Sequence, residues 1–286
     1  MELGLINLSR EIAYVLAAIA ILFFGKLTLN LLTPFKIDDE LSAKDNPAFG
    51  LSITGYYLGI LIIFIGASLV FGAEPASPAP IWKDLPVTLG WAALGVGLLN
   101  VARVVTDKLI LKAFSTRKEI IEDRNVGMGA VEFGIYVGSA LVLAGAVSGR
   151  GGGVQTALAF FALGQMGLIC VAWIYQRTTR YDFADEIEKD NVAAGVAFGG
   201  NCIAVGIVLM RGTAGDFLSW SENLLQFGWY FICAVILLLL GRFAIDFVLL
   251  PRRTLHQEIV EDRNINAGYL EGGLLMGLAA VISVML

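Results

Sequence analysis

Residues 119–134, EIIEDRNVGMGAVEFG, and residues 258–273, EIVEDRNINAGYLEGG, are two copies of one motif in a chain of 286 residues. Each copy opens with a charged acid-acid-base-amide cluster and runs on into an apolar stretch. Aligned on Asn125 and Asn264, both copies have glycines four and nine residues later, and Glu132 and Glu271 stand seven residues later. Such self-similarity is the mark of an internal repeat.

Two weaker copies of the motif each begin with a lysine. They are KDNPAFGLSITGYYLG at 44–59 and KDNVAAGVAFGGNCIAVG at 189–206. Aligned on Asn46 and Asn191, they share the glycines at the fourth and ninth following positions with the other two copies. The four copies therefore alternate between K-D-N and E-D-R-N. We expect each copy to close one helical hairpin, and a pair of hairpins to form the larger repeat.

The composition is that of a membrane protein. The chain is 57% hydrophobic and 16% charged, whereas soluble domains are about 25% charged. Its apolar residues fall into runs of about 20, the length that crosses a bilayer as a helix. The prediction is an all-α polytopic membrane protein with eight transmembrane helices, arranged as four hairpins, at about 12–33, 48–71, 86–113, 126–147, 154–175, 192–211, 224–250 and 265–286.

The basic residues are unevenly distributed among the connections. Of the 20 Lys and Arg residues, those in or beside the first, third, fifth and seventh connections are Lys26, Lys36, Lys44, Arg103, Lys108, Lys112, Arg117, Lys118, Arg124, Arg177, Arg180, Lys189, Arg242, Arg252, Arg253 and Arg263. The other side has only Arg10, Lys83, Arg150 and Arg211. The positive-inside rule predicts that the first group is cytoplasmic and that both termini lie outside.

The repeat predicts two halves, residues 1–148 and 154–286, joined by a glycine-rich linker at 149–153. Arg103 precedes Asn125, and Arg242 precedes Asn264, by the same 22 residues. All hairpins are predicted to enter the membrane from the same side. The halves are therefore expected to be related by a pseudo-two-fold axis near the membrane normal, as in transporters with parallel repeats.

The candidate functional residues are ionisable groups predicted to lie within the membrane. Glu132 and Glu271 each stand about 10 Å beyond their asparagine at 1.5 Å per residue. A lone carboxylate at that depth is costly and needs a partner. Arg103 is the expected partner of Glu132, and Arg242 of Glu271, with i,i+4 pairs to Asp107 and Asp246 as the alternative. A structural clamp and a transport pathway are both compatible with these residues.

The polar residues that open each motif are expected to lie where a loop enters a helix. The charged residues of E-D-R-N are expected to be solvated there: Glu122, Asp123, Arg124, Glu261, Asp262 and Arg263. The asparagines are expected to bond backbone groups at the helix start. The glycines are expected to let helices approach closely, with Gly129 and Gly268 making room for the arginine-bearing helices.

Several function classes find no support in the sequence. His256 is the only histidine, which excludes a multi-histidine metal site, and no cofactor motif is present. The net charge of −5 gives no reason to expect nucleic acid binding. The chain has no HExxH and no GxSxG motif, and its serines and threonines are scattered. We therefore expect a protein that is not an enzyme.

The E-D-R-N cluster with its glycine ladder resembles that of the YjfL-like bacterial inner-membrane proteins, the family named domain of unknown function 350. Typical members match one four-helix half, so this chain resembles two such units fused. The resemblance implies residence in the bacterial inner membrane and a link to envelope-stress modules. It implies no established activity, and no catalytic residue is carried over.

Two function classes remain. The first is a channel or small-ion transporter whose path passes Glu132 and Glu271. The second is a membrane scaffold that recruits cytoplasmic envelope-stress proteins through its charged loops. In both classes the first partner of the protein is the lipid bilayer. Both classes are also compatible with a homo-oligomer.

Overall fold

The fold was obtained as a computed structural model that describes residues 2–68, 80–110, 115–179, 181–250 and 253–286. These residues form helices and contain no strand. Eight helices are long and apolar enough to span a membrane. The predicted all-α membrane fold with eight spanning helices is thus confirmed. Lys112, Arg180 and Arg252, three of the basic residues used for the orientation, lie outside the described residues.

The long helices follow the predicted apolar runs closely. They are α1 (Glu2–Leu32), α2 (Pro47–Ser68), α3 (Ile81–Val105), α4 (Val126–Val147), α5 (Val154–Thr178), α7 (Val192–Thr213), α8 (Trp220–Ala244) and α9 (Ile265–Met285). Shorter elements lie between them: α6 (Phe183–Glu188) and the one-turn π-helices η1 (Asp39–Ala43), η2 (Thr106–Ile110), η3 (Lys118–Glu122), η4 (Ile245–Leu249) and η5 (Gln257–Glu261).

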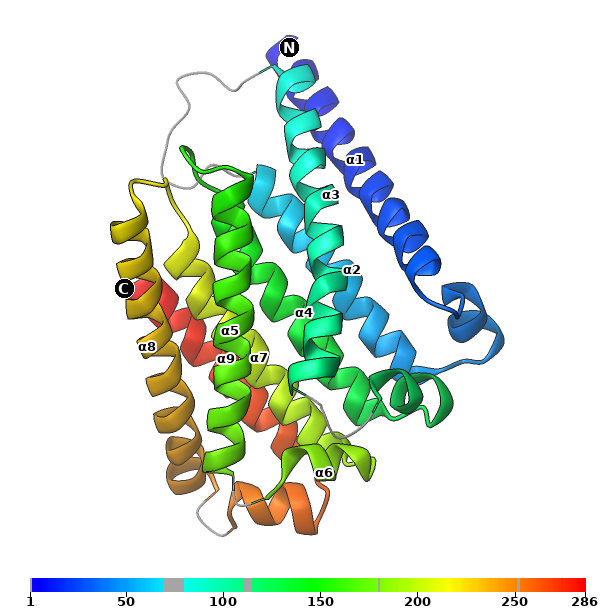
Figure 1. Cartoon of the computed structure of the whole chain (residues 1–286), viewed down its shortest axis with the longest axis vertical. Coiled ribbons are helices and arrows are strands. Elements are labelled where there is room, and N and C mark those ends of the chain that lie inside the picture. Colours follow the sequence, from blue (N-terminus) through cyan, green and yellow to red (C-terminus); the bar gives the residue numbers. More distant parts are fainter. Residues whose placement is uncertain (1, 69–79, 111–114, 180, 251–252) are drawn as a thin grey trace.

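The long helices form two layers (Figure 1). Helices α2, α4, α7 and α9 run side by side in a slanted row, in which α4 packs on α2, α7 on α4, and α9 on α7. Helices α3, α5 and α8 stand more upright across this row, and α1, the fourth outer helix, slants alongside α3. Along the chain, an outer helix leads into a motif and an inner helix leads out of it.

The two middle helices of the inner row differ in side chains from the outer helices, because they face different surroundings. The outer helices expose large apolar side chains, among them Leu16, Phe23, Leu240 and Phe243, as expected of a surface covered by lipid. The inner helices α4 and α7 are 78% buried along their most apolar stretch, against 22% for α1. Their glycines permit this, because small residues let membrane helices approach until the backbones touch.

All four motifs meet at one end of the molecule, which we call the motif end. The residue before each asparagine has a positive φ: Asp45, Arg124, Asp190 and Arg263. This left-handed residue turns the chain sharply, and the next residue, Asn46, Asn125, Asn191 or Asn264, starts the inner helix.

The contacts of the inner row repeat hairpin by hairpin. The contact between α4 and α7, which joins the two sequence halves, is as extensive as those within each half. The partition at 149–153 and the pseudo-two-fold relation of the halves therefore stay predictions.

Candidate functional site: carboxylates buried in the inner helix row

The motif asparagines tie neighbouring motifs together. Each uses its side-chain oxygen as a helix cap: Asn125 accepts from Met128 N at 2.9 Å, and Asn191 from Ala194 N at 3.2 Å. In the first three motifs the asparagine amide also donates to a backbone carbonyl of the next motif. The three links are Asn46 to Ile120 O (2.8 Å), Asn125 to Ile187 O (2.5 Å) and Asn191 to Ile259 O (2.7 Å).

A glutamate completes each of these caps. The same amide nitrogens also donate to Glu40, Glu119 and Glu186, at 3.2, 3.0 and 2.9 Å. Burial raises the pKa of Glu119 above its usual range, and the bond from Asn125 lowers it by a smaller amount. The bonds of these glutamates to the asparagines were not predicted, although a glutamate stands five or six residues before every motif asparagine.

The expected role of Gly129 and Gly268 was wrong in one respect. A Cβ on Gly129 would lie 2.5 Å from Ala48 O of α2, and one on Gly268 would lie 2.5 Å from Ala193 O of α7. Both glycines therefore make room for the preceding inner helix. They do not make room for the arginine-bearing helices α3 and α8, because those stand in the outer layer.

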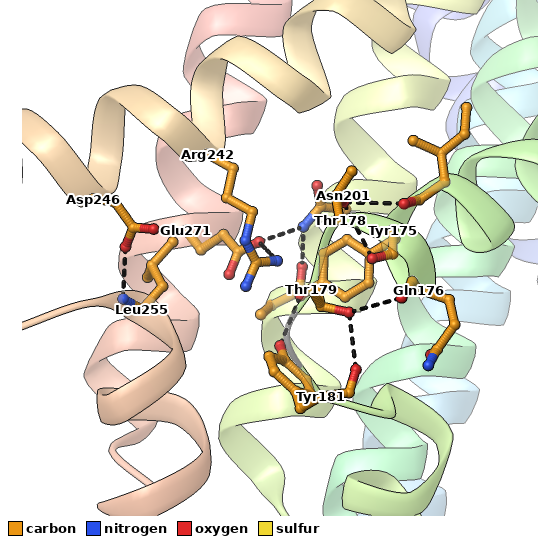
Figure 2. Close-up of polar contacts among 12 residues, drawn as sticks. Tyr175, Gln176, Thr178, Thr179, Tyr181, Asn201, Arg242, Asp246, Leu255 and Glu271 are labelled. Atoms are coloured by element: carbon orange, nitrogen blue, oxygen red, sulfur yellow. Dashed lines mark hydrogen bonds and ion pairs between the residues drawn. The ribbon is translucent and has the colours of Figure 1, made fainter.

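In the second half, the structure brings Arg242 and Glu271 together (Figure 2). Arg242 Nη1 lies 3.1 Å from Glu271 Oε1, and the two side chains are 11% and 0% exposed. Asn201 Nδ2 of α7 donates to the same oxygen at 3.3 Å. A buried carboxylate thus receives a charged and a neutral donor from two different helices.

Aromatic rings enclose the guanidinium of Arg242. Its central carbon is 5.1 Å from the centre of the Tyr175 ring and 5.8 Å from that of Tyr181, within the range of cation–π attraction. Asp246, the alternative partner of Arg242, instead accepts from Leu255 N at 2.6 Å and so fastens the following connection (Figure 2).

In the first half, the expected pair is not formed. Ser52 Oγ of α2 donates to Glu132 Oε2 in a short hydrogen bond, and no ion pair joins Glu132 to Arg103 within the described ranges. The expected clamp between Arg103 and Glu132 was therefore wrong. Ser52 reaches Glu132 from the preceding inner helix α2, as Asn201 of α7 reaches Glu271, so in the described chain the first half has the neutral donor but not the charged one.

A cavity of about 40 Å³ lies beside Glu132. Its polar lining includes Ser52, Arg103, Asp107, Thr116 and Glu132. Three buried polar atoms on this lining have no hydrogen-bond partner: Arg103 Nε, Asp107 Oδ1 and Thr116 Oγ1. A cavity that holds a water molecule needs about 10–15 Å³ and polar partners, and this cavity meets both conditions.

The charged residues of the E-D-R-N motifs lie outside this site. Glu122, Asp123, Arg124, Glu261, Asp262 and Arg263 are all exposed at the motif end. Asp123 pairs with Lys118 at 3.4 Å, and Asp262 pairs with Arg253. These residues therefore lie on the surface of the motif end and do not touch either buried carboxylate.

Comparison with known proteins places the chain in a family of membrane proteins. It is similar to a UPF0719 transmembrane protein of Aquifex aeolicus (strain VF5), at 26% identity over 82% of this chain and 84% of that protein. It is also similar to the UPF0719 transmembrane protein YshE of Bacillus subtilis (strain 168), at 26% identity over 44% of this chain and 88% of that protein. No solved structure matches.

The family model described as Domain of Unknown Function (DUF350) matches twice, over residues 3–147 and 151–286. Two matches in one chain agree with the internal repeat and with the paired buried carboxylates. The chain is therefore a member of the DUF350 family in which two copies of the family unit are fused.

Proposed function

We propose that the protein moves protons or small monovalent cations across the membrane, with Glu132 as the group that binds the positive charge. The observation that carries this proposal is the difference between the two buried carboxylates. Glu271 is held by Arg242 at 3.1 Å, whereas the hydroxyl of Ser52 is the one described partner of Glu132, which lines a polar cavity. An acid in the membrane without an ion-pair partner is a functional candidate, because it is costly to keep.

The cavity leads from Glu132 toward the motif end. Its lining includes Glu132 and Tyr136 from within α4, and Thr116 and Arg117 from the connection before the motif asparagine. Arg117 is exposed. Two carboxylates, Glu132 and Asp107, face the guanidinium of Arg103 and, at the exposed end, that of Arg117, so the proposal rests on Glu132 itself and not on an excess of negative charge in the lining. The proposed role is transport, with no catalytic step.

The test is flux in proteoliposomes. A pH-sensitive dye follows protons, and separate assays follow Na⁺ and K⁺, so that the arms distinguish the ion. Glu132→Gln should abolish the flux, while Glu122→Gln, on the exposed surface of the motif end, should leave it unchanged. Flux that persists at the wild-type rate in Glu132→Gln, or no flux of any of the three ions in the wild type, would overturn the proposal.

We also propose that the protein resides in the bacterial inner membrane, with the motif end in the cytoplasm and both termini outside. The excess of basic residues in the motif connections supports this orientation. The test is a reporter enzyme of the kind that works only outside the cytoplasm, fused after Leu286. This fusion should show activity. Activity of a cytoplasm-only reporter at the same position would reverse the orientation.

The second candidate is a scaffold for cytoplasmic proteins. It is favoured by the exposure of the charged residues in both E-D-R-N copies, of which Arg124 and Arg263 are held in a left-handed turn. A scaffold should lose function in Arg124→Ala or Arg263→Ala and should tolerate Glu132→Gln. A transporter should show the reverse pattern, so the two candidates separate on the same set of variants.

A further inference from the structure

We propose that a second copy of this chain packs on α9 through its helix α2, and so continues the inner row from one molecule to the next. Within the chain, the same packing occurs three times, from α2 to α4, from α4 to α7 and from α7 to α9. At the two ends of the row, α9 and α2 each lack one neighbour, and they do not pack on each other in the described part of the chain.

The leading face of each inner helix is defined by the glycine nine residues after its asparagine. A Cβ on Gly55 of α2 would lie 2.5 Å from the Cα of Phe133, one on Gly134 would meet the backbone of Gly199, and one on Gly200 would meet Gly272. The fourth member, Gly273 of α9, is exposed and has nothing within 4 Å of a Cβ.

The opposite face shows the complementary deficit on α2. Gly129, Gly195 and Gly268 each approach the backbone of the preceding inner helix. Their counterpart Gly50 approaches only Leu41 of its own motif, at 3.8 Å. Farther along the same face of α2, Thr54 is exposed and Ile65 is 53% exposed. The face that meets a neighbour in α4, α7 and α9 is therefore open in α2.

The asparagine links at the motif end have the same gap. The residues whose carbonyls accept from the preceding asparagine, Ile120, Ile187 and Ile259, are 4%, 0% and 0% exposed. Leu41 is their counterpart in the first motif and is 36% exposed. Asn264 donates to Glu258 at 2.7 Å, and no described carbonyl of this chain takes its second bond.

These deficits fit each other. In the proposed contact, the amide of Asn264 donates to the carbonyl of Leu41 in the second copy. Gly273 packs against α2 of that copy at Thr54. An exposed glycine face in a bilayer associates with another helix because close packing is favourable there. The two surfaces differ, so the contact is heterologous, and repeated contacts either close into a ring or extend the row.

The test is disulfide cross-linking between two differently tagged copies of the full-length chain in native membranes. Both copies carry Cys170→Ser, Cys202→Ala and Cys233→Ser. One copy carries Thr54→Cys and the other Gly273→Cys, matching the contact between Gly134 and Gly199 inside the chain. The expected result is a band that carries both tags. The matched control replaces Gly273→Cys by Leu240→Cys, on the exposed face of α8, and should give no such band.

A second variant separates assembly from folding. A side chain at 273 meets nothing within one molecule, so Gly273→Leu should fold. In detergent, the protein mass of the particle should fall from a multiple of the chain mass to that of a single chain. The cross-link should also disappear. A wild-type chain that is a single copy and cross-links no better than the control would overturn the proposal, with lipid then covering α9.

Discussion

Arg242 Nη1 lies 3.1 Å from Glu271 Oε1, whereas their counterparts in the first half, Arg103 and Glu132, form no ion pair in the described chain. One sequence motif has therefore produced two different environments for a carboxylate in the membrane. The difference between them is measurable, and it is the basis of the first two predictions.

Removing one member of the buried pair should destabilise the protein strongly. Arg242→Met leaves Glu271 as an uncompensated buried charge, at a cost of about 3–5 kcal/mol. The double variant Arg242→Met/Glu271→Leu should be close to wild type, because no charge is then left unpaired. Unfolding by SDS in mixed micelles, followed by tryptophan fluorescence, measures both. A double variant as unstable as Arg242→Met would contradict this account.

Glu132→Gln should be far less damaging than Glu271→Gln. The amide oxygen of the introduced glutamine still accepts from Ser52, so the change should cost less than about 1.5 kcal/mol. Glu271→Gln leaves the guanidinium of Arg242 without its counter-charge and should cost more. The same unfolding experiment compares the two isosteric changes. Equal losses would mean that Arg103 supports Glu132 as closely as Arg242 supports Glu271.

The backbone contacts of the inner row should tolerate no methyl group. A Cβ on Gly138 would lie 2.6 Å from Cys202 O, so Gly138→Ala should cost about 1–3 kcal/mol through overpacking. Gly97, in the middle of α3, has nothing within 4 Å. Gly97→Ala should instead stabilise the protein by about 0.5–1 kcal/mol through helix propensity. Thermal unfolding of both variants in detergent tests the contrast in sign.

The asparagine links should be worth more than a helix cap alone. Ser219→Ala removes the cap on Glu222 N of α8 and an exposed bond with Ser221, and should cost about 1 kcal/mol. Asn125→Ala removes a cap and also the two bonds that its amide donates, to Ile187 O and to Glu119, although Ile187 O keeps its bond from Asp190 N. The two lost bonds should add about 1–3 kcal/mol. Unfolding of the two variants side by side measures the excess, and equal losses would assign no stabilisation to the link.

The sequence was sufficient to predict the eight spanning helices, because an apolar run of bilayer length has few alternatives. It also identified Arg242 and Glu271, because the repeat places the same residues at the same spacing in both halves. The two residues carry opposite charges and lie in neighbouring helices. Secondary structure and the repeat bring such a pair within reach of each other but do not fix it, because Arg103 and Glu132, at the same spacing, form no ion pair in the described chain.

The contact of Ser52 with Glu132 was not predictable in the same way. It depends on how α2 slides and rotates against α4, which the sequence pattern of either helix leaves open. The error over Gly129 had the same origin, because the periodicity shows that a face is small but not which helix approaches it. The polar Asn201, in the middle of an apolar run, was a signal that sequence analysis left unused.

The fusion of two family units has a consequence for the way this site changes over generations. Subunits encoded by one gene carry every mutation in all copies at once, so two equivalent carboxylates in such an assembly keep the same neighbours. Here separate stretches of one gene encode the two halves, so a substitution in one half leaves the other half unchanged. In this chain Glu271 lies beside an arginine, and Glu132 accepts a hydrogen bond from a serine.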